Sequence, residues 1–300
     1  MDRLNSQVEN IPGQLPKRTS VSIPLSQIYG PESAASVPLS VDEQDAQDPQ
    51  CLGYYAEEIH MSLLASEYTV NPNFMQNQPH VNHKMRAILI DWMVSMHLKF
   101  RLLPETLYLS VHLVDRYLEK VSIQKKHLQL LGIASLLIAS KYEEIYPPQT
   151  RNFIACTDQA YNKQQLLTME NDMLRVFEFN ITVPSILRFL ERYARLAQVP
   201  ANAFFLAKYI SELALIENHL NRFKASIIAL CSLYIALKVL KLESLWEKVQ
   251  EFASDSSFSA CAKDTLLVFQ VSHNHPLSAV RDKYARVEFG EVSKIRLNNA

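Results

Sequence analysis

Three charged residues stand inside segments that are otherwise apolar, and they are the first candidates for chemistry. Arg86 and Asp91 lie in the run Met85-Arg-Ala-Ile-Leu-Ile-Asp-Trp92, and Lys141 ends a second apolar run. A charge inside an apolar helix is costly unless it is paired or faces a partner. We expect Arg86 to form a structural ion pair with a carboxylate such as Asp115. For Lys141, an internal pair and a partner-binding role are both open.

The residue types that build enzyme active sites form no recognisable constellation. The chain has five glycines and lacks the GxGxxG and GxxxxGK loops, which excludes Rossmann enzymes, P-loop NTPases and protein kinases. Its four cysteines include no CxxC pair, so we expect reduced thiols rather than a zinc site or disulfides. His273 and His275 form an HxH without neighbouring ligands, which favours a solvated turn over a metal site. We therefore expect no catalytic residues, no metal and no cofactor, in a protein that is not an enzyme.

The overall composition indicates a helical protein with no broad basic surface. The 300 residues carry a formal net charge of −1, and 48% of them are hydrophobic. Scarce glycine beside plentiful Leu, Ala, Glu and Lys disfavours turn-rich β architectures. The apolar runs fall short of the roughly 18 residues that a membrane span requires, and the start of the chain lacks the apolar stretch of a signal peptide. We expect a soluble, intracellular protein that binds neither nucleic acid nor membrane.

Residues 1–50 differ in composition from the rest of the chain. They hold six of the 14 prolines and a single aromatic residue, Tyr29, with three basic and seven acidic side chains. Such a segment cannot bury enough apolar area to offset the entropy that it loses on ordering. We expect a disordered regulatory tail.

The rest of the chain predicts helices in two similar halves. Prolines separate segments with helical periodicity, and the segment that begins at Pro104 overlays the one that begins at Pro200. Residues 133–141 likewise overlay residues 230–238. These last two segments are apolar nearly all round, so each must be buried. We expect two bundles of about five helices, each wrapped on one central helix.

Six segments of the chain resemble the cyclin family, and in particular B-type (G2/mitotic-specific) cyclins. They are Met85–Trp92, Phe100–Thr106, Val114–Leu118, Ser140–Pro148, Ile186–Ala194 and Ala279–Tyr284. The resemblance implies an all-α, tandem cyclin-box fold of two five-helix bundles, with a preceding helix and a disordered N-terminal tail. The expected boundaries are 1–50 for the tail, 51–182 for the preceding helix and first box, 183–285 for the second box and 286–300 for a C-terminal tail.

The resemblance also implies a function. It is that of a regulatory subunit that binds and activates a cyclin-dependent protein kinase in a heterodimer, controls G2/M progression and helps to recruit substrates, in the nucleus and the cytoplasm. Residues 1–50 are then expected to be dispensable for kinase activation. The alternative is a cyclin-fold transcription factor or scaffold that activates no kinase. The missing CxxC pair and the slightly acidic charge balance disfavour the transcription-factor version.

Family roles carry over to particular positions. The residues implied to bind the kinase are Ile59, Lys141, Tyr142, Glu143, Glu170, Leu174 and Phe179. A patch implied to dock substrates that carry a basic-x-leucine motif comprises Met85, Leu89, Trp92 and Gln129. The first three of these lie at i, i+4 and i+7, on one face of a helix. Core packing is the alternative role for that face.

Overall fold

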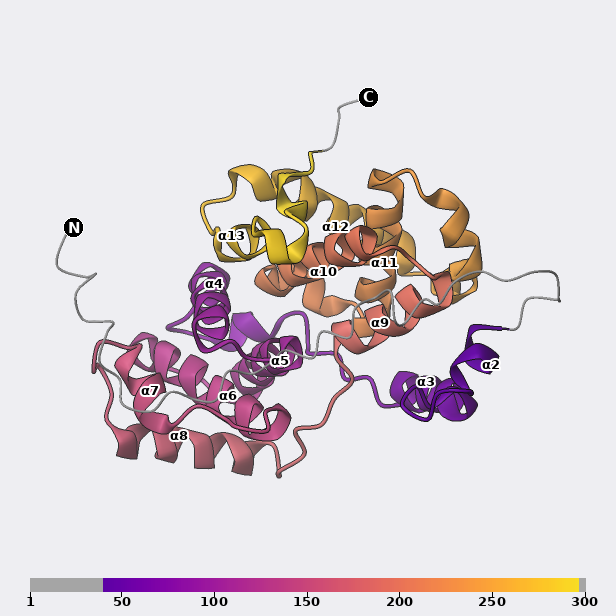
Figure 1. The fold of residues 1–300 in the computed structure, drawn as a ribbon. Coiled ribbons are helices and arrows are strands. Elements are labelled where there is room, and N and C mark those ends of the chain that lie inside the picture. The colour runs from indigo at the N-terminus through magenta and orange to yellow at the C-terminus, as the bar shows by residue number, and fades with distance from the viewer. Residues whose placement is uncertain (1–39, 297–300) are drawn as a thin grey trace. The chain divides into compact units, whose positions relative to one another are not determined.

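The part of the chain that the computed structural model describes, residues 40–296, contains helices and no strands (Figure 1). The first bundle comprises α4 (His83–Phe100), α5 (Pro104–Lys120), α6 (Leu128–Glu143), α7 (Thr150–Ala155) and α8 (Lys163–Val176). The second bundle comprises α9 (Ile186–Ala197), α10 (Ala201–Ile216), α11 (Ala225–Val239), α12 (Phe258–Val271) and α13 (Ala279–Tyr284). Two further helices, α2 (Val41–Asp45) and α3 (Ala56–Ala65), come before the first bundle in sequence. The predicted all-α fold with two five-helix bundles and a preceding helix is confirmed.

Short-range sequence signals begin several of these helices. The Asn82 side chain accepts a hydrogen bond of 3.0 Å from the backbone N–H of Met85 at the start of α4. Asn162 and Gln165 cap each other's backbone N–H groups at the start of α8. Pro104 occupies the first turn of α5, where a missing N–H has no intrahelical partner to lose. These starts follow from local chemistry that is readable in the sequence.

One helix in each bundle is buried on nearly all sides, as the repeat predicts. In α6 every residue from 130 to 140 is buried, and in α11 the same holds for all but one residue from 226 to 237. Small residues let neighbouring helices approach such a helix closely. At Gly132 of α6, an added Cβ would lie 2.8 Å from the side chain of Leu89 on α4. Within residues 40–296, no helix has the length and apolar character needed to cross a bilayer.

Arg86 joins the two bundles through buried hydrogen bonds. Its guanidinium group donates two bonds of 2.6 Å to the carboxylate of Asp115 on α5. A third bond, of 2.9 Å, runs from Arg86 Nη1 to the carbonyl oxygen of Ile216 at the end of α10. Asp115 also accepts a bond of 2.8 Å from Asn221 in the turn η4 (Asn218–Arg222). The Arg86–Asp115 ion pair is therefore present, and it ties the first bundle to the second.

Asp91, the other charge in that apolar segment, also contacts the second bundle. Its Oδ1 accepts a hydrogen bond of 2.9 Å from the backbone N–H of Ala279, the first residue of α13. A carboxylate at a helix N-terminus satisfies an N–H that has no intrahelical partner and interacts favourably with the helix dipole. Burial raises the pKa of Asp91, and the hydrogen bond from Ala279 opposes that rise. Both charges of the Met85–Trp92 segment thus stabilise the junction between the bundles.

The ordered chain extends beyond the predicted tail boundaries at both ends. The sequence predicts a disordered tail up to residue 50, whereas residues 41–45 form α2 and contact α9. Residues 1–39 lie outside the described residues. The predicted C-terminal tail begins at residue 286, but Val292 and Ser293 are buried, and Ile295 packs against the core. An average composition over fifty residues does not resolve a helix of five.

Candidate functional site

Lys141 and Glu170, both expected to bind the kinase, form an ion pair at the surface of the first bundle. Lys141 lies in the last turn of α6, and its Nζ donates to Oε1 of Glu170 on α8 at 2.5 Å. The Glu170 side chain is 11% exposed, whereas the Lys141 side chain is 48% exposed. A nearly buried carboxylate therefore holds one side of an ammonium group whose other side is open to a partner. The two roles left open for Lys141 are compatible.

Three large apolar side chains are exposed just beyond the two helices that carry this ion pair. Ile145 and Tyr146 follow α6, Phe179 follows α8, and they are 80%, 69% and 68% exposed. Exposed apolar side chains near a charged pair are typical of a protein-binding surface. The sequence predicts a binding role for Phe179 but not for Ile145 or Tyr146. Their position directly before Pro147-Pro148, where the helix cannot continue, was the available signal.

The backbone after α8 holds Phe179 in an unusual conformation. Glu178 and Phe179 both have positive φ angles, of 53° and 60°, in a region that bulky side chains rarely occupy. Two hydrogen bonds of 2.9 Å support this turn, from Phe179 N–H to the carbonyl of Leu174 and from Arg116 to the carbonyl of Asn180. Such strain persists where surrounding contacts impose it, and it is concentrated at functional sites. The turn therefore presents Phe179 to solvent in a defined geometry.

Tyr142 and Leu174 complete this surface. The Tyr142 ring is half-exposed, and its hydroxyl hydrogen-bonds the hydroxyl of Thr182 at 2.6 Å. Leu174 is half-buried on α8, one turn after Glu170. Five of the seven predicted kinase-binding residues thus lie near the end of α6, in the second half of α8 or in the turn that follows α8. We call this the α6–α8 surface; it comprises Lys141, Tyr142, Glu170, Leu174 and Phe179, with Ile145 and Tyr146 added by the structure.

The other two predicted kinase-binding residues have different surroundings. Glu143 is half-buried, and its pKa is raised first by burial and then by the charges of Glu105 and Glu144. Glu143 and Glu105 of α5 line one cavity, so the two carboxylates are near each other. Ile59 is half-buried on α3, a separate helix. Contact between Ile59 and a kinase thus depends on what holds α3 in place.

The residues expected to dock substrates lie on α4 and at the start of α6, and they differ in burial. Met85, Trp92 and Gln129 are half-buried, whereas Leu89 is 5% exposed. Leu89 packs on Gly132, where the absent side chain leaves room for it. Leu89 is a core residue and cannot form the surface of the patch, which corrects the prediction for this position. The other three side chains remain accessible in part.

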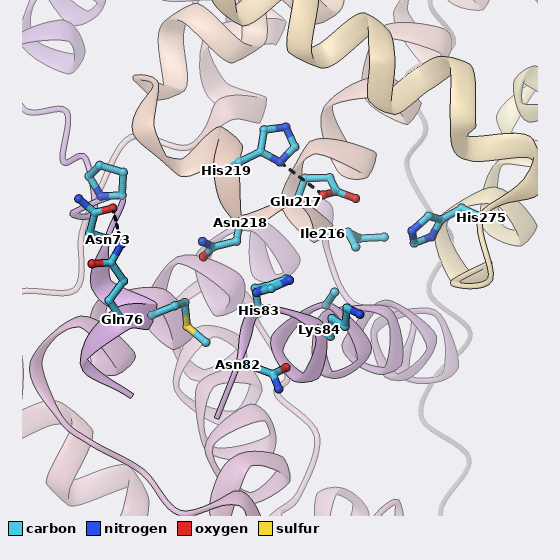
Figure 2. Close-up of a pocket in the computed structure, with 13 residues that line it drawn as sticks. Asn73, Gln76, Asn82, His83, Lys84, Ile216, Glu217, Asn218, His219 and His275 are labelled. Atoms are coloured by element: carbon cyan, nitrogen blue, oxygen red, sulfur yellow. Dashed lines mark hydrogen bonds and ion pairs between the residues drawn. The ribbon is translucent and has the colours of Figure 1, made fainter. Parts of the chain in front are cut away.

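A cavity of about 670 Å³ opens between the N-terminus of α4 and the end of α10 (Figure 2). Polar side chains from both bundles line it, among them His83, Lys84, Asn218 and His275. Oε2 of Glu217 lies 3.5 Å from Nδ1 of His219, and this hydrogen bond is the main cause that lowers the pKa of Glu217. The cavity is lined by residues of other elements than those of the α6–α8 surface, so it is a separate feature of the molecule.

The two histidines of the HxH sequence have different surroundings. Nε2 of His273 lies 3.1 Å from the carbonyl oxygen of Ile295, whereas His275 lines the cavity. Among residues 40–296, no group of three or more His, Cys, Asp or Glu side chains is placed to hold a metal ion. All four cysteines lie in this range and are free thiols.

Comparison with known proteins assigns both bundles to one family. Residues 58–182 match the family model "Cyclin, N-terminal domain", and residues 184–297 match "Cyclin, C-terminal domain". The G2/mitotic-specific cyclin-B of Dictyostelium discoideum is 37% identical over 86% of this chain and 61% of its own length. The G2/mitotic-specific cyclin-B of Spisula solidissima is 38% identical over 88% of this chain and 63% of its own length. Cyclin-A1-4 of Oryza sativa subsp. japonica is 39% identical over 84% of this chain and 74% of its own length. This chain therefore spans about three fifths of the length of these two B-type relatives.

Two solved structures have a similar fold. A viral cyclin from herpesvirus saimiri superposes with a TM-score of 0.57 at 20% identity, covering 71% of this chain and 97% of its own. A chain of the CAK complex from Chaetomium thermophilum bound to ATP-gamma-S superposes with a TM-score of 0.52 at 15% identity, covering 87% of this chain and 85% of its own. At these identities the likeness concerns the fold alone.

Proposed function

Because this chain belongs to the cyclin family, we propose that it is a regulatory subunit that binds and activates a cyclin-dependent protein kinase. The kinase supplies the catalytic groups, including a Lys–Glu pair that a mobile helix must bring into place. A binding partner shifts such an equilibrium by as much as it prefers one conformation over the other. The role of this chain is then to bind the active conformation more tightly, and so to raise its population.

The α6–α8 surface, which we propose to face the kinase, is the observation that supports this proposal most directly. A half-exposed ammonium group, fixed by a nearly buried carboxylate, provides a directional polar contact at the pair Lys141–Glu170. Exposed Phe179, Ile145 and Tyr146 provide apolar area that a partner can bury. A few anchor residues of this kind supply most of the binding free energy of a protein interface, and truncating one weakens binding by about 2 kcal/mol or more. Charge fixes the geometry of docking, and apolar area supplies most of the affinity.

We place the activity at the G2/M transition, a finer assignment that rests on the relatives. The proteins from Dictyostelium discoideum and Spisula solidissima are named G2/mitotic-specific cyclin-B. Cyclin-A1-4 from Oryza sativa has a similar sequence identity to this chain, so sequence identity alone does not distinguish a B-type from an A-type cyclin. For a mitotic regulator we propose presence in both nucleus and cytoplasm. Abundance through a synchronised cell cycle, together with immunolocalisation, tests both assignments.

Substrate recruitment is proposed for the accessible part of the α4 face. Met85 and Trp92 offer half-buried apolar surface, and the amide of Gln129 can hydrogen-bond an extended peptide backbone. A leucine from a basic-x-leucine segment fits such a surface. The core residue Leu89 lies beneath it and supports it.

Copurification tests the main proposal. The chain is isolated from its own cells, and histone-kinase activity is measured in the isolate. We expect a kinase subunit to copurify and its activity to depend on the chain. A stable isolate without kinase subunit or kinase activity would contradict the proposal and favour a scaffold that uses the same fold.

A further inference from the structure

Residues 40–50, the N-terminal strap, bind the second bundle although they precede the first bundle in sequence. The strap contains α2, which lies beside α9 in Figure 1. Its first residue, Ser40, caps α2 by accepting a hydrogen bond from the N–H of Glu43, whose carboxylate accepts one from Ser40 N–H. The strap therefore has its own local structure at the point where it contacts α9.

Two arginines of α9 hold the strap through paired hydrogen bonds. Arg192 donates to both carboxylate oxygens of Asp42, at 2.5 and 2.7 Å. Arg195 donates in the same way to Asp45, with a bond of 2.9 Å from its Nε. All four side chains are less than one third exposed. The hydrogen bond from Arg192 holds the pKa of Asp42 below its ordinary value.

The two acidic residues on α2 have the same spacing as the two arginines on α9. Asp42 and Asp45 are three residues apart on α2, and Arg192 and Arg195 are three residues apart on α9, so each pair projects from one side of its helix. Bidentate pairs between guanidinium and carboxylate combine strength with directional specificity. This arrangement fixes the position of the strap along α9.

The strap leads directly into α3, which also packs on the second bundle. Backbone atoms of the strap approach Gly53 so closely that a Cβ there would lie 2.3 Å from the carbonyl oxygen of Asp42. From α3, the ring of His60 lies edge-on to three aromatic rings of the second bundle, at centroid distances of 5.3 to 5.9 Å. Those rings belong to Phe189, Tyr193 and Phe252.

After α3, the chain leaves the second bundle and contacts the first bundle. Glu67 accepts hydrogen bonds of 2.9 and 2.8 Å from the backbone N–H and hydroxyl of Ser226 at the start of α11. The next residue, Tyr68, instead donates a bond of 2.5 Å to Glu119 on α5 of the first bundle. Residues 40–67 are thus anchored on the second bundle. The second bundle therefore positions Ile59, which the sequence resemblance places at the kinase interface.

We infer that Arg192 and Arg195 are positioning residues for kinase binding: by holding the strap, they hold α3 so that Ile59 meets the kinase from a fixed place. This inference rests on the proposed function. A partner that requires a docked α3 binds more weakly in proportion to the fraction of molecules in which α3 is docked. Neither arginine needs to touch the kinase. The inference also revises the expectation that residues 1–50 are dispensable, because residues 40–50 contain the strap.

Charge reversal and charge exchange in the full chain test the inference. The variants are Arg192→Asp with Arg195→Asp, the reciprocal Asp42→Arg with Asp45→Arg, and the fourfold exchange that combines them. We expect each reversal to weaken binding of the kinase subunit about tenfold or more, since lost hydrogen bonds between charged groups typically have effects of that size. Amide hydrogen exchange in residues 41–65 of the free chain should become faster. The fourfold exchange should restore the kinase affinity and the rate of amide hydrogen exchange to within about threefold of those of the unaltered chain.

Two further variants separate positioning from general damage. Arg286→Asp removes a surface arginine that follows α13 and pairs with the exposed Glu288. It should change neither the kinase affinity nor the rate of amide hydrogen exchange. Arg192→Gln with Arg195→Gln is the milder variant to use if the charge-reversal variants do not fold. It should also weaken kinase binding and speed amide hydrogen exchange, each to a smaller extent.

Unchanged kinase affinity in a folded reversal variant would overturn the inference. So would a loss of affinity that the charge exchange does not restore, because the arginines would then act by another route. If the unaltered chain bound no kinase, the proposed function would fall. The hydrogen-exchange measurement would still decide whether these arginines hold α3.

Discussion

Arg86 of the first bundle donates a hydrogen bond of 2.9 Å to the carbonyl oxygen of Ile216 in the second bundle, from a guanidinium group that is fully buried. The same group is paired with Asp115, and Asp115 in turn accepts a bond from Asn221 of the second bundle. One buried cation and its counter-ion therefore contact both repeats. The junction depends on these polar contacts being complete, because any member left alone would be a buried, unpaired polar group.

Replacement of this cation should destabilise the whole chain. In Arg86→Met, Asp115 is left buried without its counter-ion and the carbonyl of Ile216 loses its donor. We expect the free energy of unfolding to fall by about 3–5 kcal/mol, the usual cost of breaking a buried pair. Urea titration followed by circular dichroism measures the loss. The double variant Arg86→Met with Asp115→Leu should be less destabilised than the single one. A single variant within about 1 kcal/mol of the unaltered chain would contradict a role for the pair in stability.

Loss of the ammonium group of Lys141 should weaken kinase binding. Lys141→Ala removes a half-exposed charge and leaves the nearly buried Glu170 carboxylate without that partner, so we expect the free energy of unfolding to fall by about 1–3 kcal/mol. Affinity for the kinase subunit should fall about tenfold or more, as for an interface anchor. Glu170→Ala should show a similar loss of affinity.

The repeat supplies a matched control for Lys141. Lys238 occupies the equivalent place at the end of α11, is exposed, and lies over the ring of Tyr234 at 5.0 Å from its centroid. Lys238→Ala should leave kinase affinity unchanged. Equal losses for the two lysine variants would mean that the effect comes from general charge and not from the α6–α8 surface.

The helices could be predicted because their signals are local. Periodicity, the caps at Asn82 and Asn162, and Pro104 all act within a few residues, and the repeat identified the central helix of each bundle. The need of Arg86 for a carboxylate also followed from its apolar surroundings. The strap could not be predicted, because Asp42 and Arg192 are 150 residues apart and no periodicity relates them.

The same limit applies to the candidate sites. A spacing of i, i+4 and i+7 shows that Met85, Leu89 and Trp92 share a helix face, but it does not show which neighbour covers each of them. Gly132, on another helix, decides that Leu89 is buried. Exposure of Ile145 likewise depends on where the chain turns after α6. Residue type and spacing thus identified the faces, and tertiary packing decided which side chains remained accessible.

His97 should make the protein less stable as the pH falls below neutrality. Burial is the main cause that lowers its pKa from 6.5 to about 4 in the folded chain. Between these two values the unfolded chain binds more protons than the folded chain, so the free energy of unfolding decreases as the pH falls. We expect His97 alone to account for a loss of about 2 kcal/mol between pH 7 and pH 5.

Urea titrations at several pH values measure this slope. His112, which is also buried and has a pKa lowered to about 3, contributes a slope of the same sign. His97→Gln should therefore reduce the slope without abolishing it. An unchanged slope in this variant would show that His97 carries no part of the pH dependence.

Truncation of the α4 patch should separate substrate docking from kinase activation. In Met85→Ala with Trp92→Ala, the half-buried apolar surface is lost while Leu89 still packs on Gly132. For a substrate with a basic-x-leucine segment, we expect KM to rise about thirtyfold, as for the loss of a hot-spot anchor. Activity on a short peptide without that segment should persist. Leu89→Ala is the comparison, because truncation of a buried leucine should destabilise the chain by about 2–5 kcal/mol and affect both substrates alike. Equal losses on both substrates in the double variant, with a matching fall in Tm, would place Met85 and Trp92 in the core with Leu89.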